Sequence, residues 1–575
     1  MSEVGPTGGE LLAETLHTAG IRDVFTLHGG HLDAFLVACR KWDIRLTDTR
    51  HEASAGHAAD AYARLTGRPS VCVTTSGPGF TNTVTAIANA YLDAIPVLFV
   101  VGAPPLREAE TNPLQGGFDQ IATAAPMTKW AHRVTNGERI PELVALALRH
   151  AVTGKPGPVL LEVPIDVMFR PVAASHVRMP DLELAVARPG LAGDQAGLIL
   201  HELSRAQRPV IVTGGGAMLS RCSPELITFA DRFGIPVFTP NKGDGLLPAG
   251  HPMWAGGAMQ FGALSALGLA PDLVILLGAR AGMLTGGRSG PLSGARIIQI
   301  DTDAAEIGRM HDVAVGAVAD CREALRALLS ATESAAQPLT AADPGWATQV
   351  TAMRGMMAGL FPDPTTESGR IHPYFAARDI MANVPPRTIT VLDGGEAPAW
   401  ADMHVAAEEP DSVLRLGYLG CLGVGQGFAI GACRAAPDRP VLLLTGDGSA
   451  AFHIAEFDTM ARHAMPVVTV VFNNAVWAMS AHGQDAVYGQ NQRVVTEVAD
   501  SDYEKTAIAF GGYGERIDRL EDLGPAVAKA FTAGVPVCLN VAVAPEVVHP
   551  LTTAMLGDVT STTEIVVPYY ENIPL

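Results

Sequence analysis

An aspartate and an asparagine that could bind a divalent cation each follow a short apolar run. Asp447 comes after the run 441–445, and Asn474 lies just beyond the run 467–472. Apolar runs of this length, bounded by turn residues, are typical of buried parallel strands. Residues 454–463 between them are predicted to form a helix. Both side chains should therefore lie at the carboxyl edge of one βαβ unit, where open α/β sheets bind ligands.

The groups available at this edge are those that Mg²⁺ prefers. Asp447 offers a carboxylate, Asn474 an amide oxygen, and the following turn the backbone carbonyl of Val476. Mg²⁺ takes few protein oxygens and completes its coordination with water and phosphate. Gly446 and Gly448 allow a diphosphate to approach the backbone. Gly-Asp-Gly alone is common in ordinary turns, but the whole pattern favours a metal–diphosphate site.

The composition is that of a large globular protein. The 575 residues are 48% hydrophobic and 17% charged, which predicts three or four core-rich domains. The net charge of −19 disfavours nucleic acid and anionic membrane as partners. No apolar run approaches the ~18 residues that span a bilayer, the first residues lack the features of a signal peptide, and no Cys-x-x-Cys pair occurs. We therefore expect a cytoplasmic protein.

Residues 1–172 are expected to form a first α/β domain with polar groups at its strand ends. Strands are predicted at 23–27, 71–75, 95–101 and 157–164. His31 lies in the Gly-rich turn after the first of these, a position suited to proton handling. Glu52 precedes a predicted helix, 53–65, although the helix dipole alone would explain an acid there. The turn 76–82 carries the glycines and proline of a tightly held loop.

Two further domains are expected, at residues 190–330 and 368–544. The second domain has strands predicted at 209–213, 273–277 and 297–301. Its Gly-rich turn, 214–216, is by itself a weak sign of a bound nucleotide. Arg280 and Asp301 fit phosphate and ribose contacts, or a structural ion pair. The third domain contains the Asp447 turn.

The C-terminal tail, residues 545–575, is the last segment with a predicted role. It is rich in apolar residues and poor in glycine, whereas a frayed terminus would be more polar. We expect it to pack over the active site as a lid.

The pattern from Gly446 to Asn474 resembles the cofactor motif of thiamine diphosphate enzymes, which runs from Gly-Asp-Gly to Asn-Asn. The segments 50–52, 77–79 and 157–159 fall in the order expected for the pyrimidine-binding domain of that family. The resemblance covers essentially the whole chain. It implies three Rossmann-like parallel-sheet α/β domains, which are the pyrimidine-binding, central and diphosphate-binding domains. The implied cofactors are thiamine diphosphate and Mg²⁺, with ADP, CoA, FAD or no ligand in the central domain.

The same resemblance implies roles for individual residues. Glu52 matches the glutamate that hydrogen-bonds the aminopyrimidine ring and favours its imino tautomer, and Leu422 matches the apolar residue that bends the cofactor. Asp447, Asn474 and the Val476 carbonyl match the metal ligands. The other positions implied to contact the cofactor are Gly29, Ser76, Gly79, Asn82, Glu396, Gly420, Gly446, Gly448, Ser449, Trp477, Ala478 and Met479, with Arg280 and Asp301 as candidates in the central domain.

Within the family, the chain most resembles benzaldehyde lyase and the 2-hydroxyacyl-CoA lyases. His31 and Gln115 match the residues that contact substrate in benzaldehyde lyase, whereas Met479 replaces a small residue and should narrow a pocket built for an aryl ring. The tail resembles the lid of lyases that act on short branched 2-hydroxyacyl-CoAs. The expected reaction is reversible cleavage of a substrate such as 2-hydroxyisobutyryl-CoA to formyl-CoA and a ketone or aldehyde. Asp485 and Glu497 are candidates for the base, and His31 is a rival.

Three alternatives remain open. A benzaldehyde lyase-like carboligase of 2-hydroxy ketones would need no CoA. An acetolactate synthase-like enzyme, or a decarboxylase of 2-oxoacids or oxalyl-CoA, is compatible with the fold. A non-catalytic nucleotide-binding subunit would not need Glu52, Asp447 and Asn474 together. Because the two ends of the cofactor bind different subunits in this family, a homodimer is the expected minimal unit and a tetramer is common.

Overall fold

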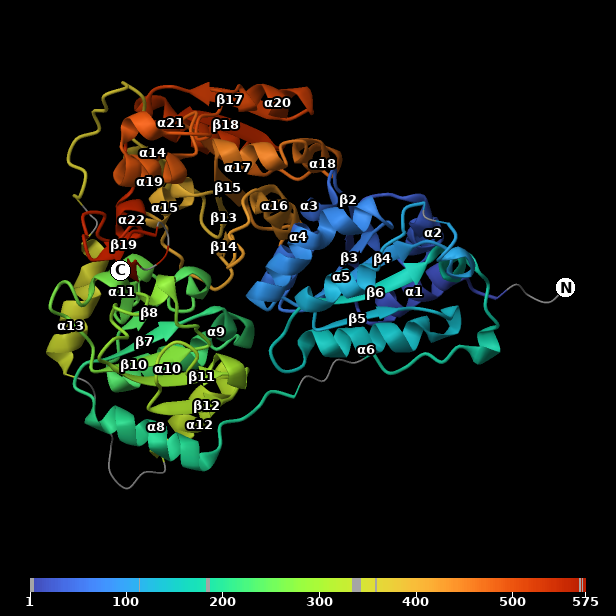
Figure 1. Ribbon diagram of the computed structural model, residues 1–575, viewed down its shortest axis with the longest axis horizontal. Coiled ribbons are helices and arrows are strands. Elements are labelled where there is room, and N and C mark those ends of the chain that lie inside the picture. The colour runs from blue at the N-terminus through green and yellow to red at the C-terminus, as the bar shows by residue number, and fades with distance from the viewer. Residues whose placement is uncertain are drawn as a thin grey trace.

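The chain builds three six-stranded sheets in which every strand pair is parallel. The computed structural model describes residues 5–112, 114–182, 187–333, 343–356, 359–567, 570 and 572–575. Figure 1 shows three bodies, with the N-terminal domain in blue and cyan, the central domain in green and yellow, and the C-terminal domain in orange and red. The predicted α/β class with three parallel-sheet domains is confirmed.

The N-terminal sheet has the order β2-β1-β3-β4-β6-β5. Its strands are β1 Asp23–Thr26, β2 Arg45–Asp48, β3 Ser70–Thr74, β4 Val97–Ala103, β5 Trp130–Arg133 and β6 Val159–Pro164. Its helices are α1 Gly8–Thr18, α2 Asp33–Lys41, α3 Glu52–Thr66, α4 Pro78–Asp93, α5 Gln120–Ala124, α6 Ile140–Val152 and α7 Ile165–Phe169.

The central sheet has the order β12-β11-β10-β7-β8-β9, which is the Rossmann strand order. Its strands are β7 Pro209–Thr213, β8 Val237–Phe238, β9 Trp254–Gly256, β10 Leu273–Leu277, β11 Arg296–Asp301 and β12 Val315–Val318. Its helices are α8 Gly193–Arg205, α9 Gly215–Ser220, α10 Ser223–Phe233, α11 Ala258–Ala263 and α12 Cys321–Glu333. Helix α13, Pro344–Ala352, also packs here, because Trp346 donates a hydrogen bond to the Pro209 carbonyl at 3.0 Å.

The C-terminal sheet, β14-β13-β15-β16-β18-β17, repeats the strand order of the first sheet. Its strands are β13 Ile389–Asp393, β14 Val413–Arg415, β15 Val441–Gly446, β16 Val468–Asn473, β17 Tyr513–Ile517 and β18 Val537–Ala542. Its helices are α14 Pro373–Ala382, α15 Glu396–Asp402, α16 Val424–Ala435, α17 Asp447–Phe452, α18 Glu456–Arg462, α19 Ala478–Tyr488, α20 Tyr503–Ala509 and α21 Leu520–Ala530. The helix predicted over 454–463 therefore begins at Glu456, and a second short helix precedes it.

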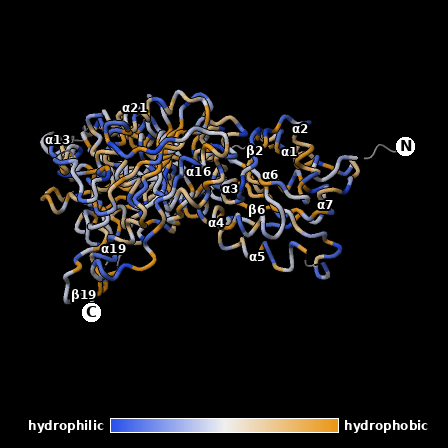
Figure 2. Tube along the Cα trace, turned by 90° about the horizontal axis from the view of Figure 1, so that it is seen from above, coloured by the Kyte–Doolittle hydropathy of each residue, from blue (hydrophilic) through white to orange (hydrophobic). Residues whose placement is uncertain are grey.

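Both faces of each sheet are buried, as parallel strands require. Along β15, Leu442 and Leu444 pack in one apolar cluster and Leu443 in another. The tube in Figure 2 shows the hydrophobic stretches, in orange, gathered inside the domains. Within the described residues, no helix is long and apolar enough to cross a membrane.

Helices α3 and α16 join the N-terminal and C-terminal domains through one continuous apolar cluster. A Cβ added at Gly427 would meet the His57 Cβ at 2.7 Å, and one at Gly431 would meet the Ala58 carbonyl at 2.2 Å. Only glycine therefore allows the two helices to approach this closely. This contact fixes α3, which begins with Glu52, against the C-terminal domain.

The C-terminal segment contains α22 Pro550–Ala554 and a small antiparallel pair, β19 Glu564–Ile565 and β20 Ile573–Pro574. In the view of Figure 1 it lies over the boundary of the C-terminal and central domains, and Figure 2 shows β19 and the C-terminus projecting away from them. Residues 568, 569 and 571 of the expected lid lie outside the described residues.

Candidate active site

The proposed site residues gather at the topological switch point of each sheet. There, the connections that follow two neighbouring strands run to opposite sides. These switch points lie between β1 and β3, between β7 and β10, and between β13 and β15. At such a point the connections leave opposite faces of the sheet and open a crevice at the carboxyl ends of the strands. His31, Arg280 and Asp447 each follow one of these strands.

The loop predicted to bind metal, residues 447–449 and 474–476 (the metal loop), is built by backbone donors around one carboxylate. Asp447 accepts hydrogen bonds from the amides of Gly448 at 2.7 Å, Asn474 at 3.1 Å and Ala475 at 2.7 Å. Burial raises the pKa of Asp447 to about 6, against the opposing effect of these amides. The Asn474 side-chain oxygen accepts from the Val476 amide at 3.2 Å. A carboxylate, an amide oxygen and a carbonyl are therefore held in adjoining turns.

The surroundings fit a magnesium–diphosphate group. The donor set consists of hard oxygens, as Mg²⁺ requires. A Cβ added at Gly420 would meet nothing within 4 Å, and one at Gly446 would meet only the Ala397 Cβ, at 3.7 Å. The rim is thus open where phosphates would lie. By contrast, a Cβ at Gly448 would lie 2.4 Å from the Trp477 ring, so this glycine is needed for packing.

Asp393 ties the metal loop to the adjacent Gly-rich turn. It is fully buried and accepts hydrogen bonds from the amides of Gly423 at 3.1 Å and Gly425 at 3.1 Å and from the Ser449 hydroxyl at 3.3 Å. Burial raises its pKa to about 6. The predicted prop, Leu422, is thereby fixed beside the loop that contains Asp447.

Glu52 lies on the other domain, at the first position of α3. Its Oε2 accepts a hydrogen bond from the Asn82 amide at 3.0 Å, and an added Cβ at Gly79 would lie 3.7 Å from its Oε1. The side chain is 7% exposed. Thr75 packs against both Gly79 and Gly29, since a Cβ added at Gly79 would meet it at 2.7 Å and one at Gly29 at 2.4 Å. The structure thus brings Glu52, Gly79, Asn82 and Gly29 together.

His31 and Gln115 lie on the same face of the N-terminal domain. The His31 Nδ1 is 3.3 Å from the Thr75 hydroxyl, and burial lowers the pKa of the imidazole. Gln115 is exposed and adopts a left-handed backbone conformation, φ 54°, while its carbonyl accepts a hydrogen bond from the Ser76 hydroxyl. The exposed loop around Gln115 therefore adjoins the turn at Ser76.

Glu396 makes contacts that the sequence did not indicate. Its Oε1 lies 2.8 Å from the His482 Nδ1 and accepts a hydrogen bond from the Thr552 hydroxyl at 2.6 Å. The other imidazole nitrogen of His482 faces the Pro545 carbonyl at 2.8 Å. Acceptors at both nitrogens favour the imidazolium form of the ring. Although burial alone would lower it, Glu396 raises the pKa of His482.

The two acids proposed as bases lie in different surroundings. Asp485 forms an ion pair with Arg493, which lowers the pKa of its carboxyl. Glu497 is exposed, but its backbone pairs with Val476 in the metal loop. Neither carboxylate is buried against apolar side chains. For Asp485, the lowered pKa is the opposite of the raised pKa that is typical of a general base.

A single cavity of about 2830 Å³ connects the central domain to the metal-loop domain. It is lined by the Gly-rich turn 214–216, by Gly395, Leu422 and Met479, and by the C-terminal segment through Leu551. Met479 lies in its wall next to Gly395, because a Cβ at Gly395 would meet the Met479 Cβ at 3.2 Å. An elongated ligand has room to reach from the central domain to the metal loop.

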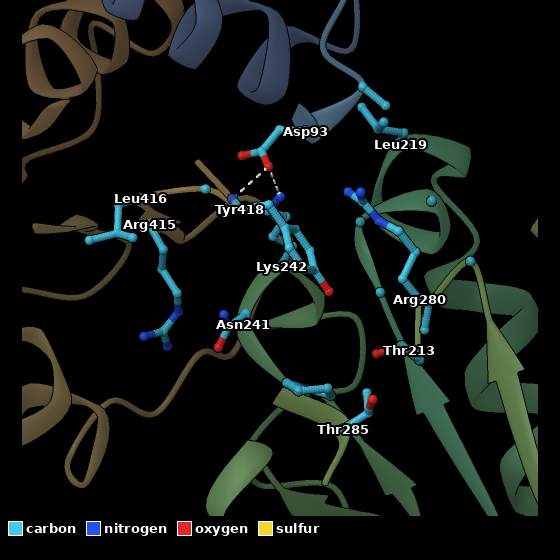
Figure 3. A pocket seen from close by; sticks show the side chains of 18 of the residues that line it. Asp93, Thr213, Leu219, Asn241, Lys242, Arg280, Thr285, Arg415, Leu416 and Tyr418 are labelled. Carbon is cyan, nitrogen blue, oxygen red and sulfur yellow. Dashed lines mark hydrogen bonds and ion pairs between the residues drawn. The ribbon is translucent and has the colours of Figure 1, made fainter. Parts of the chain in front are cut away.

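Three domains meet in the wall of this cavity (Figure 3). Asp93 of the first domain pairs with Lys242 of the second and accepts a hydrogen bond from the Tyr418 amide of the third at 3.1 Å. Arg280 lies over the Tyr418 ring at 4.1 Å and donates to the Leu92 carbonyl at 2.6 Å.

Asp301 instead accepts a hydrogen bond from the Asp303 amide at 2.9 Å, and burial raises its pKa. Among the described residues, Arg280 and Asp301 form no ion pair with each other.

Comparison with known proteins gives consistent matches along the chain. Residues 6–123, 198–328 and 393–541 match, respectively, the N-terminal TPP binding, central and C-terminal TPP binding domains of the thiamine pyrophosphate enzymes.

Full-length relatives include two kinds of enzyme. The acetolactate synthase large subunit of Mycobacterium tuberculosis is 32% identical over 94% of this chain and 96% of its own length. The probable acetolactate synthase large subunit of Methanocaldococcus jannaschii is 31% identical over 95% of this chain and 93% of its own. The 2-hydroxyacyl-CoA lyase 2 of Homo sapiens is 31% identical over 89% and 85%.

Proposed function

The chain belongs to the thiamine pyrophosphate enzyme family, and we propose that within it this protein is a carbon–carbon lyase of short 2-hydroxyacyl-CoAs. The proposed reaction is reversible cleavage of a substrate such as 2-hydroxyisobutyryl-CoA to formyl-CoA and a ketone or aldehyde. The similarity to 2-hydroxyacyl-CoA lyase 2 supports this reaction class.

The observation that carries the proposal is the continuous cavity. An acyl-CoA has a nucleotide at one end and its reacting carbonyl far away at the other. The cavity runs from the Rossmann-type turn 214–216 to Gly395 and Met479 beside the metal loop. Arg280, at the β7/β10 switch point, is suited to bind phosphate. The same central site would alternatively hold ADP while CoA enters from the side of the lid.

The cofactor site is proposed to be shared between two domains. Asp447, Asn474 and the Val476 carbonyl would hold Mg²⁺, and Glu52 would hydrogen-bond the aminopyrimidine ring. Bound thiamine diphosphate supplies the carbon nucleophile and the electron sink that cleavage of a carbon–carbon bond needs. Leu422 would support the cofactor between these two ends.

His31 is the proposed proton acceptor for the substrate hydroxyl. Burial lowers its pKa, so the imidazole is neutral and able to accept a proton near pH 7. Gln115, in the adjoining loop, would hydrogen-bond the substrate. The ion pair with Arg493 keeps the Asp485 carboxylate a weak base. Glu497, beside Val476, remains a second candidate.

The active unit is proposed to be a homodimer, with a tetramer as the expected larger assembly. Glu52 contacts Asn82 of its own domain. Large apolar side chains are exposed on both halves of the proposed site, including Leu114 and Phe118 on the first domain and Phe452 on the third. A partner subunit would cover these groups. The seven free thiols fit a reducing cytoplasm.

A second candidate is acetolactate synthase-like condensation of 2-oxoacids, because several relatives with that name match nearly the whole chain. Carboligation of 2-hydroxy ketones and decarboxylation of a 2-oxoacid or oxalyl-CoA are further possibilities within the family. A pocket narrowed by Met479, which lies in the cavity wall beside Gly395, would favour small substrates over benzoin.

The test is a competition assay with thiamine diphosphate and Mg²⁺. The enzyme is offered 2-hydroxyisobutyryl-CoA, pyruvate and benzoin in parallel, and products are identified by mass spectrometry. We expect formyl-CoA and acetone, with benzoin untouched. Acetolactate from pyruvate as the main product would replace the lyase by the second candidate, and benzaldehyde from benzoin alone would overturn the role of CoA.

A further inference from the structure

Helix α18 of the C-terminal domain is hydrogen-bonded to the loop directly before Glu52. The carboxylate of Glu456, at the first position of α18, accepts hydrogen bonds from the Arg50 and His51 amides, both at 3.1 Å. These residues lie more than 400 positions away in the sequence, with a separation of 405 for His51. Glu456 is 1% exposed.

The Glu456 carboxylate is held in one orientation. The Thr459 hydroxyl, one turn further along α18, donates to its Oε2 at 2.6 Å. The carboxylate therefore has three neighbouring donors, two backbone amides and one hydroxyl. A hydrogen bond to a charged acceptor is stronger than one between neutral groups. The contact is a strong link between the two domains.

The opposite end of α18 holds the same loop. Arg462 donates to Asp48 at 2.8 Å, and the His463 Nε2 lies 2.9 Å from the same carboxylate. Residues 48–51 are thus fixed at both ends by residues 456–463. The loop passes directly into α3, where the His51 Nδ1 accepts the Ala53 amide at 3.1 Å as the N-terminal cap.

We propose that Glu456 is a positioning residue that sets the place of the Glu52 carboxylate at the start of α3. The inference rests on the proposed role of Glu52 toward the cofactor. Glu456 itself touches neither substrate nor cofactor. Through Glu456, the C-terminal domain of a chain fixes the position of Glu52 on the N-terminal domain of the same chain. In the proposed dimer, that glutamate serves the site whose metal loop belongs to the partner.

The test compares two substitutions on the same helix. Glu456→Gln keeps the size of the side chain but turns one oxygen into a donor that faces backbone amides. Asp458→Asn is the matched control, because the Asp458 carboxylate contacts the side chains of Arg50, at 3.7 Å, and Arg462, at 2.7 Å, and its replacement leaves the backbone bonds to Glu456 in place. Backbone amide exchange at residues 50–53 is measured in the protein without cofactor. The exchange rate of the cofactor C2 proton is measured in the protein loaded with thiamine diphosphate and Mg²⁺.

We expect Glu456→Gln to speed amide exchange at Arg50 and His51 and to slow C2-proton exchange by about 10- to 100-fold, as displacements near 1 Å do. Cofactor affinity should change less than threefold, and Asp458→Asn should match wild type. Equal behaviour of the two variants would overturn the inference. If wild type binds no thiamine diphosphate, the proposed function fails. The amide exchange at Arg50 and His51 still reports whether Glu456 holds the loop before α3.

A second variant covers the case in which Glu456→Gln does not fold. Thr459→Val keeps the charge of Glu456 but removes the hydroxyl that orients it. The same changes in both exchange rates are expected, at smaller size. Unchanged C2-proton exchange in a folded Thr459→Val protein whose Arg50 and His51 amides exchange faster would refute the positioning role.

Discussion

Replacement of His482 by alanine is expected to release the C-terminal segment from the C-terminal domain. The side chains of His482 and Glu396 are 2% and 4% exposed and lie 2.8 Å apart. Removing one partner of a buried ion pair costs about 3–5 kcal/mol, because the other charge stays buried. The Thr552 hydroxyl still donates a hydrogen bond to Glu396 in the variant. We therefore expect a cost at the lower end of this range. His482 and Glu396 both belong to the C-terminal domain, and the C-terminal segment contacts Glu396 through Thr552, so undocking the segment lets water reach the unpaired Glu396. The penalty therefore falls on the docked state, and about 3 kcal/mol shifts the docking equilibrium roughly a hundredfold.

Limited proteolysis within residues 545–575 measures this release, since cleavage follows the population of the open form when closing is fast. Asp485→Asn is the control on the same helix, because it breaks a more exposed ion pair, typically a contribution below about 1 kcal/mol. Equal cleavage rates in the two variants would refute the reasoning.

The wild-type segment should also respond to pH. The pKa of His482 is raised above its ordinary value of 6.5 in the folded protein. The stabilisation it contributes is therefore complete below that value and is lost as the pH rises through the folded pKa. Cleavage that slowed with rising pH would contradict the imidazolium assignment.

Three further substitutions test the site itself. Glu52→Gln should slow C2-proton exchange of bound thiamine diphosphate by about 10²- to 10⁴-fold while the cofactor stays bound, and loss of binding instead would make Glu52 a structural residue. Asp447→Asn should weaken Mg²⁺-dependent cofactor binding by more than about 100-fold, which exceeds the effect of replacing a residue that only contacts a metal ligand. A fluorescence titration that matches wild type would show that Asp447 does not bind the metal. Met479→Ala should raise kcat/KM for benzoin relative to 2-hydroxyisobutyryl-CoA by about 10-fold or more, and an unchanged ratio would show that this side chain does not limit the pocket.

The fold was predictable from its buried central strands. Runs such as 441–445 and 273–277 are apolar throughout because both faces of a parallel strand are covered. Edge strands lack this signal, as β5 and β14 show with their half-exposed residues. The shared strand order of the first and third sheets was also hidden, since topology requires no sequence repeat.

Local motifs located the metal loop, because Asp447 and Asn474 each follow their own strand directly. Contacts between distant segments gave no such signal. His482 and Glu396 lie 86 positions apart, and Thr552 lies 156 from Glu396. The interdomain role of Glu456 likewise depends on the packing of α18 against the loop before α3. Short helix α17 was missed because Gly448 and Ser449 are poor helix formers.

The most direct test of the shared cofactor site is complementation between inactive subunits. Glu52→Gln and Asp447→Asn proteins are mixed in equal amounts, dissociated and reassembled, and C2-proton exchange of bound thiamine diphosphate is measured. If each site takes Glu52 from one subunit and Asp447 from the other, half of the dimers are mixed and each has one intact site, so about a quarter of the wild-type signal should return. No recovery in reassembled dimers would mean that both residues serve a site within one chain, which would contradict the account.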